Sequence, residues 1–241
     1  MQILKIDSTT STNTWIAAHE TELASPGLVY CKEQTAGRGQ RGNSWESEPG
    51  KNITASVVFH PGDFKASAQF LISEIVALSI AEYLQKKDVS VKIKWPNDIY
   101  AENKKICGIL VEHVVTGRNI TRTIAGFGIN LNQTEFKSDA PNPISLKMIT
   151  GKNYNIDEEI KELADILEKN IYSLKEPGGT HTQFLSKLWR ADGQYYNFFD
   201  RKKEERIKAR ITTVAEDGII FLTTDSGEMR EYAFKEIEYI L

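Results

Sequence analysis

The first feature of this sequence with the residue types for chemistry is a loop rich in glycine and arginine. It reads Gly37-Arg38-Gly39-Gln40-Arg41-Gly42, and Trp45 follows closely. Glycine lacks a Cβ atom, so its backbone N–H groups can approach a ligand. Arginine pairs with phosphate and carboxylate oxygens, and an aromatic ring can cover a flat base. The loop predicts a nucleotide-type anion site, although it is neither a P-loop nor a dinucleotide fingerprint. A plain surface turn is the alternative.

A second candidate is the segment Lys94-Trp95-Pro96-Asn97-Asp98, where a lysine, an amide and a carboxylate share one predicted hairpin corner. Hard carboxylate oxygens suit Mg²⁺, so Asp98 is the candidate metal ligand. The alternative is a structural turn in which the tryptophan packs and the polar residues are solvated.

Glycines inside predicted strands form the third candidate. Gly108 follows Lys105 by three residues, and Gly126 and Gly128 open one face of a later strand. A glycine within a strand often marks close approach by a ligand or another backbone. Lys105 could then reach a bound carboxylate or phosphate. A solvated hairpin lysine and a crowded sheet crossing remain the alternatives.

The elements that must position these residues alternate between strands and helices. Strands are predicted at 3–6, 28–32, 53–60, 91–94, 99–101, 105–115 and 120–131. Apolar residues at helical spacing predict a long helix from Phe70 to about Lys86. Three further helices are predicted: one from the N-cap region at 8–13 through Leu23, one over 157–174 and one over 180–191. Residues 132–143, with two prolines, predict a mobile loop.

From about residue 197 the pattern changes to short strands, at 205–214, 219–224, 229–232 and 237–241. Turn residues separate them at Glu216-Asp217-Gly218 and Asp225-Ser226-Gly227. This pattern predicts a small β-barrel appended to an α+β domain.

The bulk composition is that of an ordinary globular protein of 241 residues with a formal net charge of −3. That charge argues against a surface devoted to nucleic acid. Apolar runs of membrane-spanning length and a signal-peptide pattern are lacking, so a cytoplasmic protein without membrane attachment is expected. Cys31 and Cys107 have no metal-type spacing and are expected to be reduced thiols.

Taken together, the motifs resemble those of the biotin protein ligases over nearly the whole chain. The matching segments are Ser11-Thr12-Asn13, residues 37–45, 94–98, 105–112 and 126–130. The resemblance implies an α+β fold: a mixed β-sheet flanked by helices, like a class II synthetase core, over residues 1–195, and a small C-terminal SH3-like β-barrel over 196–241.

The resemblance also implies a reaction. Biotin and ATP, with Mg²⁺, would form biotinyl-5′-AMP, and a lysine of a biotin carboxyl carrier protein would then accept biotin. Arg38 and Lys105 would be the catalytic residues. Biotin would be bound by Ser11, Thr12, Asn13, Gln34, Gly37, Arg38, Lys105, Gly108, Gly126 and Gly128. ATP or the adenylate would be bound by Arg38, Gly39, Gln40, Arg41, Gly42, Trp45, Asn97 and Asn130. Asp98 would be the metal ligand.

Two departures from the family pattern stand out. Gln40 replaces a common arginine, so retention of the adenylate would depend more on Arg38, Arg41 and Lys51. Some relatives carry an N-terminal DNA-binding domain, whereas the first catalytic strand here begins at Met1-Gln2-Ile3, so no DNA partner is expected. A homodimer is possible, because a strand edge in the central domain could pair two copies or dock a carrier.

Three other functions compete with biotin ligation. A lipoate or octanoate enzyme of the same core fold should lack the full glycine–arginine loop. A passive biotin-binding module would not need the phosphate-type cations Arg38, Arg41 and Lys105. A nucleic-acid-binding barrel at 197–241 has basic residues, but Glu204 and Glu205 interrupt them.

Overall fold

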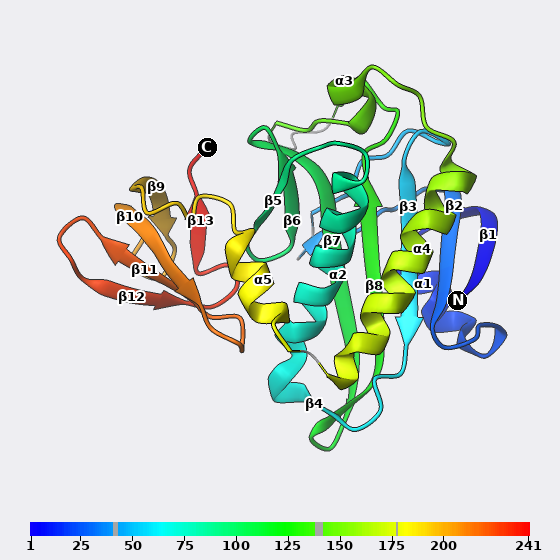
Figure 1. The fold of residues 1–241 in the computed structure, drawn as a ribbon, viewed down its shortest axis with the longest axis horizontal. Helices are drawn as coiled ribbons and strands as arrows, with labels where there is room; N and C mark the ends of the chain where they lie inside the picture. Colours follow the sequence, from blue (N-terminus) through cyan, green and yellow to red (C-terminus); the bar gives the residue numbers. More distant parts are fainter. Residues whose placement is uncertain (41–42, 138–141, 177) are drawn as a thin grey trace.

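The computed structural model describes residues 1–40, 43–137, 142–176 and 178–241, which form one large and one small β-sheet (Figure 1). Within these ranges the large sheet has eight strands in the order β1-β2-β3-β8-β7-β6-β5, with β4 paired to β8. They are β1 (Gln2–Thr9), β2 (Gly27–Gln34), β3 (Ile53–Phe59), β4 (Phe64–Lys65), β5 (Val91–Lys94), β6 (Asp98–Ala101), β7 (Lys104–Thr116) and β8 (Asn119–Ile129). Strands β1 and β2 run parallel and the other neighbours antiparallel. The predicted mixed sheet is confirmed.

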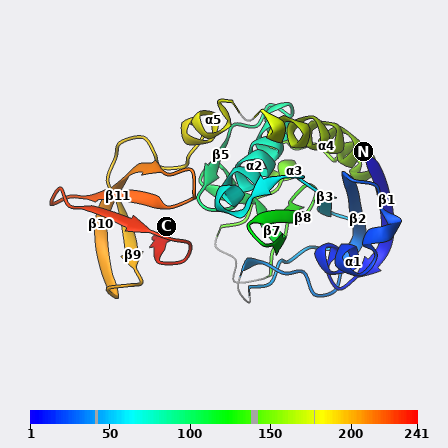
Figure 2. The same ribbon diagram turned by 90° about the horizontal axis from the view of Figure 1, so that it is seen from below.

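Helices cover both faces of this sheet. Helix α2 (Gln69–Gln85) and helix α4 (Ile156–Tyr172) lie on one face, and α1 (Thr12–Ala18) lies on the other (Figure 2). The segment Ala66–Gln85 is long and apolar enough to cross a membrane, but 67% of its apolar window is buried inside the fold. A helix that is apolar on every side belongs in the core of a protein when it is covered in this way.

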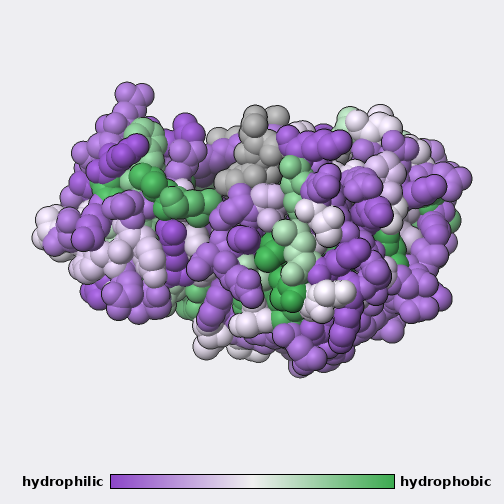
Figure 3. All heavy atoms as spheres, turned by 90° about the horizontal axis from the view of Figure 1, so that it is seen from above, coloured by the Kyte–Doolittle hydropathy of each residue, from purple (hydrophilic) through white to green (hydrophobic). Residues whose placement is uncertain are grey.

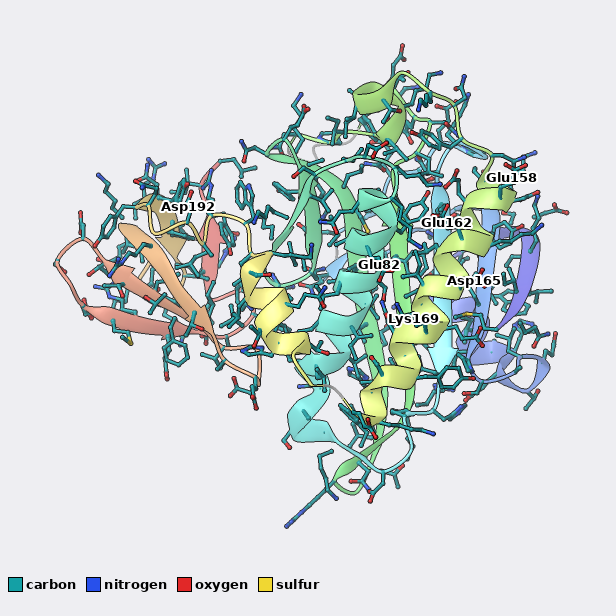
Figure 4. The ribbon with its side chains drawn as sticks, viewed as in Figure 1. Glu82, Glu158, Glu162, Asp165, Lys169 and Asp192 are labelled. Carbon is teal, nitrogen blue, oxygen red and sulfur yellow. The ribbon has the colours of Figure 1, made fainter. Side chains whose placement is uncertain are left out.

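Helix α4 is amphipathic and packs beside α2 on the same face of the sheet. Its buried residues include Ile160, Leu163 and Leu167, which recur every three or four positions. Figure 4 labels Glu158, Glu162, Asp165 and Lys169 along the outer side of this helix. Such a pattern gives a helix one apolar stripe toward the core and one charged face toward water. Figure 3 shows the same division over a whole face of the molecule, which is mostly hydrophilic with hydrophobic residues gathered in narrow strips.

The hairpins that carry the candidate site follow the predicted turns. Strand β6 turns into β7 at Glu102 and Asn103, both with positive φ (49° and 64°), as a tight two-residue hairpin requires. Gly117, with φ 63°, makes the turn between β7 and β8. The cysteines Cys31 and Cys107 are buried free thiols, as expected.

The sequence prediction erred at several elements. Helix α1 ends at Ala18 and is followed by a 3₁₀ turn at Glu20–Glu22. The short helix α3 (Leu146–Thr150), capped by Ser145, was not predicted. Helix α5 (Thr180–Ser186) ends five residues before the predicted Ala191.

The early end of α5 has a tertiary cause. The amide of Ile93 donates to the Lys187 carbonyl at 2.8 Å, and the amide of Trp189 donates to the Ile93 carbonyl at 2.8 Å. Extended pairing with the edge of β5 therefore replaces the last helical turns, because the edge strand satisfies the same backbone groups.

The small sheet follows at the C-terminal end. Its strands are β9 (Tyr196–Asp200), β10 (Glu205–Val214), β11 (Ile220–Thr224), β12 (Met229–Tyr232) and β13 (Ile237–Tyr239), and β9 was not predicted. They pair antiparallel in the open order β12-β11-β10-β9-β13 within the described residues. Closure into a barrel is not among these pairings, so the SH3-like barrel stays a prediction.

Trp95 joins the two sheets. It is 2% exposed, and its indole Nε1 donates to the Gly218 carbonyl at 2.9 Å, in the turn between β10 and β11. The Phe234 ring lies 5.3 Å from it, edge on. A buried indole with a satisfied N–H is a stable anchor. Trp95 therefore packs, as the structural alternative for its segment stated, and holds the small sheet beside the corner that carries Lys94 and Asp98.

Candidate active site

A cavity of about 1320 Å³ lies between the glycine–arginine loop, the face of β7 and β8, and the small sheet. Every predicted site residue that the structure describes lines it, apart from Gly37. Arg41 and Gly42 lie outside the described residues. The fold therefore brings together predicted residues that lie far apart in the sequence, from Ser11 to Asn130.

One end of the cavity is built from uncharged polar side chains, and we call it the polar end. Its residues are Ser11, Thr12, Asn13, Gln34 and Ser56. Gln34 Oε1 accepts from the Thr12 amide at 2.9 Å, and Ser56 Oγ lies 2.6 Å from both Thr12 Oγ1 and Asn13 Oδ1. Ser11 is the N-cap of α1, although its side chain makes no capping hydrogen bond. These side chains hold one another in fixed orientations.

Gly126 explains how Asn13 reaches this position. A Cβ atom on Gly126 would lie 2.2 Å from Asn13 Oδ1, a distance that no carbon atom can occupy. Asn13 Nδ2 donates to Glu112 Oε2 at 2.6 Å on β7. The glycine is therefore required because Asn13 packs flat on the sheet.

The other end of the cavity is charged, and we define the charged end as Lys94, Asp98 and Lys105. Lys105 Nζ lies 2.7 Å from Asp98 Oδ1, and Lys94 Nζ lies 3.8 Å from Asp98 Oδ2. Burial lowers the pKa of Lys94, with the nearby Asp98 acting in the opposite direction. One carboxylate is thus shared between two ammonium groups.

Trp45 covers the two glycines between these ends. Gly108 and Gly128 are directly opposed on β7 and β8. A Cβ on Gly128 would lie 2.2 Å from the Trp45 ring, and one on Gly108 would lie 2.9 Å from it. The space that these glycines leave on the sheet is therefore filled by the indole. Among the described residues, the buried Trp45 Nε1 has no hydrogen-bond partner.

The described residues on the two sides of the glycine–arginine loop are hydrogen-bonded to each other. The Trp45 amide donates to the Gly37 carbonyl at 2.9 Å, and the Gly39 amide donates to the Asn43 carbonyl at 2.7 Å. Arg38 pairs with Glu112 at 3.0 Å, and both side chains are nearly half exposed. Arg38 is therefore tied to the polar end through Glu112, which also binds Asn13.

Asn97 and Asn130, the two asparagines predicted to contact the nucleotide, make different hydrogen bonds. Asn97 Nδ2 donates to the Ile109 carbonyl at 2.6 Å, which closes the corner before β6. Asn130 is 3% exposed, its Nδ2 donates to the Ile144 carbonyl, and its Oδ1 has no partner within the described residues. A buried acceptor without a donor is costly. Asn130 therefore offers a vacant acceptor, whereas Asn97 uses its donor in the fold.

Sequence reasoning missed several residues that line or shape the cavity. Ser56 lies between the buried Ala55 and Val57 of β3. A hydroxyl between two apolar residues is the only local sign that this position has a polar role. Arg201, Lys235, Glu238 and Tyr239 come from the small sheet. No sequence pattern connects these four to the loop, because the cavity forms only when the two sheets meet.

The predicted magnesium site at Asp98 depends on the ligand groups that lie near this carboxylate. Among residues 1–40, 43–137, 142–176 and 178–241, no group of three or more His, Cys, Asp or Glu residues could hold a metal ion. Both oxygens of Asp98 face lysine ammonium groups. In this state the Asp98 carboxylate is paired with two cations, and its role as a magnesium ligand stays a prediction.

Comparisons with known proteins give a consistent result. A family model described as Biotin/lipoate A/B protein ligase family matches residues 4–130. The biotin–[acetyl-CoA-carboxylase] ligase of Paracoccus denitrificans is 31% identical over 164 residues, covering 65% of this chain and 67% of that protein. The bifunctional ligase/repressor BirA of Bacillus subtilis is 26% identical over 212 residues, covering 86% of this chain. The chain spans 64% of the length of that BirA protein.

The fold has close structural counterparts. The structure of a biotin protein ligase from Aquifex aeolicus in complex with biotin and ATP has a TM-score of 0.81, with 99% of both chains covered and 23% identity. At that identity the likeness shows the fold: a mixed sheet flanked by helices, followed by a small antiparallel sheet.

Proposed function

This chain belongs to the biotin/lipoate A/B protein ligase family, and we propose that it activates biotin with ATP as biotinyl-5′-AMP and transfers biotin to a lysine of a biotin carboxyl carrier protein. The observation that carries the proposal is one cavity with a neutral polar end and a charged end. Biotin has the same division, with a neutral ureido ring at one end and a carboxylate at the other.

The polar end and the sheet face under Trp45 lie close enough together to hold one extended small molecule. Asn13 packs against Gly126, and Trp45 packs against Gly128, two residues further along β8. Two residues of a strand span roughly 7 Å. Hydrogen bonds from Ser11, Thr12, Asn13 and Gln34 would fix the ureido ring, and the acid would point toward Lys105.

The first step is adenylation. An oxygen of the biotin carboxylate attacks the α-phosphorus of ATP, the bond to the β,γ-diphosphate breaks, and pyrophosphate leaves. Negative charge spreads over the phosphoryl oxygens in the transition state, so fixed cations stabilise it. Lys105 and Arg38 are the proposed cations, and each must leave its present carboxylate partner, Asp98 or Glu112, to reach the reacting atoms.

The nucleotide would lie under the loop. The vacant acceptor of Asn130 suits a donor such as the adenine amino group, and the Trp45 indole can leave the glycines to cover the adenylate. The other proposed nucleotide contacts are Gly39, Gln40, Arg41, Gly42 and Asn97. Asn97 would contribute only the oxygen of its side-chain amide, because its side-chain nitrogen and backbone carbonyl are bonded within the fold. Covering the site matters because water hydrolyses an acyl-adenylate.

The second step is acyl transfer. The amine of the acceptor lysine attacks the acyl carbon of the adenylate, the bond to the phosphate oxygen breaks, AMP leaves, and the amine loses a proton to give the amide. The Asp98 carboxylate lies beside the proposed position of the acyl group. Magnesium would enter with the ATP phosphates, and no step here depends on it.

Partners and organisation remain proposals as well. Beyond Ile109, no described strand pairs with β7 on the side away from β8, so that edge could receive a strand of the carrier or of a second copy. We propose residues 1–195 as the catalytic domain and 196–241 as a small domain that completes the cavity. A cytoplasmic protein without DNA or membrane partners is expected.

The test is isotope exchange between pyrophosphate and ATP with the purified protein. Exchange should require biotin and should not be supported by lipoate or octanoate. Labelled biotin should then pass to a carrier domain only when ATP is present. Exchange driven by lipoate instead would move the chain to the lipoate branch of the family. Biotin binding without any exchange would make it a passive binder.

A further inference from the structure

Lys94 has no role in the proposed reaction, yet it is among the most enclosed charges of the cavity. Its side chain is 18% exposed and lines the cavity beside Asp98. Burying a cation costs free energy unless partners compensate it. The nearest carboxylate oxygen is 3.8 Å away, which is longer than a direct hydrogen bond. A residue held at that cost needs an explanation.

Two aromatic rings hold Lys94 in place. Its Nζ lies 5.2 Å from the centre of the Tyr100 ring and 5.0 Å from that of the Tyr239 ring. Both distances are within the range of cation–π attraction. Tyr100 belongs to β6, and Tyr239 belongs to β13 of the small sheet. The ammonium is therefore confined between rings from the two sheets.

Asp98 connects Lys94 to the proposed catalytic lysine. Its Oδ1 lies 2.7 Å from Lys105 Nζ, and its other oxygen faces Lys94. The charge of Arg190 also lowers the pKa of Lys94, and the charge of Glu238 raises it. Asp98 is 15% exposed at its side chain. If Lys105 alone balanced this carboxylate, its departure toward a ligand would leave a partly buried charge uncompensated, which is strongly unfavourable.

We propose that Lys94, Asp98 and Lys105 work as one charge-sharing unit, in which Lys94 is a positioning residue that keeps Asp98 compensated when Lys105 turns to the ligand's anion. Tyr239 links the small sheet to this unit through its ring. The inference rests on the proposed function, since it assigns Lys105 to the biotin carboxylate and the phosphoryl group. It makes Asp98 a counter-ion and not a metal ligand.

The main experiment measures the KM for biotin in pyrophosphate–ATP exchange for Lys94→Met, which removes the charge and keeps an apolar stem. Lys105 should then stay bound to Asp98, and the KM for biotin should rise about tenfold or more. Lys94→Arg keeps the charge and should recover part of the loss. A Lys94→Met variant with a wild-type KM would overturn the proposal.

The double variant Lys94→Met/Asp98→Asn separates positioning from direct contact. Without the Asp98 charge, Lys105 is free, so the double variant should bind biotin several-fold better than Lys94→Met alone. If both are equally impaired, Lys94 acts on the ligand itself and the inference is wrong. Thermal unfolding of each variant shows whether a loss of activity reflects loss of the fold.

The role of the small sheet is tested by Tyr239→Leu against its matched control Tyr239→Phe, which keeps the ring. The leucine variant should raise the KM for biotin more than the phenylalanine variant. Equal values would remove Tyr239 from the unit. A shift in the Mg²⁺ concentration needed by Asp98→Asn would instead make Asp98 a metal ligand and end the proposal.

The same assays keep the two proposals distinct. Biotin-dependent exchange by the wild-type chain tests the ligase function alone. If the wild type shows no exchange, the proposed function fails. If the wild type is active and the Lys94 variants behave like it, only the charge-sharing unit fails.

Discussion

The polar end and the charged end of the cavity differ in the interactions that hold their side chains. At the polar end, Thr12, Asn13, Gln34 and Ser56 are bound to one another at 2.6 to 3.2 Å. At the charged end, Asp98 is divided between two lysines. A neutral network is complete before a ligand arrives, so it can recognise shape with little rearrangement. An ion-paired cluster must exchange partners, which suits a site where charge develops during a reaction.

The glycines explain why both ends share one sheet face. Gly126 admits Asn13, while Gly108 and Gly128 admit Trp45. A side chain at any of these positions would push one end away from the sheet. The two ends differ in chemistry, but both lie against the sheet because these three glycines have no Cβ atom. Four substitutions test whether the two ends behave differently.

The largest effect is expected from Lys105→Met at the charged end. Loss of a cation that acts on the transition state should lower the exchange rate by about 10²- to 10³-fold. The polar end should still bind biotin, which calorimetry can measure without ATP. Lys104→Met, an exposed neighbour on the same strand, is the matched control and should behave like the wild type. Equal losses in exchange and in biotin binding would contradict the separation of the two ends.

Gly128→Ala should affect the region between the ends. Its Cβ would lie 2.2 Å from the Trp45 indole, so the ring must move or the strand must shift. Overpacking of this kind costs about 1–3 kcal/mol, and exchange should fall by about tenfold or more because the loop is displaced. Urea unfolding and Trp fluorescence report both effects. Gly178→Ala, where nothing lies within 4 Å, is the control; similar losses in both would remove the special role of Gly128.

Ser56→Ala tests the polar end. The hydroxyl is fully buried and lies beside Thr12 and Asn13, so its loss leaves their orientation less constrained. Loss of such a contact costs about 1–2 kcal/mol, so the KM for biotin should rise roughly 5- to 30-fold while kcat changes little. The exposed Ser173→Ala is the control. A fall in kcat with an unchanged KM would place Ser56 in the chemistry instead.

The smallest effect is a pH dependence that only the charged end should show. Burial lowers the pKa of Lys94 in the folded chain, so the unfolded chain binds more protons between that lowered pKa and the ordinary lysine value near 10.4. The free energy of unfolding of the wild type should therefore rise with pH in this window, relative to Lys94→Met. Urea unfolding at pH 7, 8.5 and 10 measures the difference. Ser56→Ala should show no such trend relative to the wild type, and a trend of the opposite sign would contradict the burial of Lys94.

Much of the fold was accessible from local pattern. The strand Val91–Lys94 and the strand Glu205–Val214 were predicted with the bounds that the structure has, because alternating burial and adjacent turn residues mark them. Helix α2 was predicted within a few residues, since its apolar positions recur at helical spacing. The errors fell where long-range pairing decided the outcome. Residues 187–189 pair with β5 in place of continuing α5, and β9 forms only against β10 and β13.

The candidate site divides in the same way. Glycines, arginines and lysines at fixed spacing identified most of the cavity lining from sequence. The partner of each side chain did not follow from the motifs: Asp98 looked like a metal ligand and proved to be shared by two lysines. The glycine slot looked open and proved to be covered by Trp45.

What the sequence determined by itself was the set of chemical groups, the local elements that carry them and the family to which the chain belongs. Residue types and short spacings encode these, since turn, strand and helix preferences act over a few positions. The tertiary structure alone decided which charges neutralise one another and that Tyr239 reaches Lys94 across the junction of the two sheets. Those contacts join residues far apart in the chain, and their geometry depends on packing that no local pattern specifies.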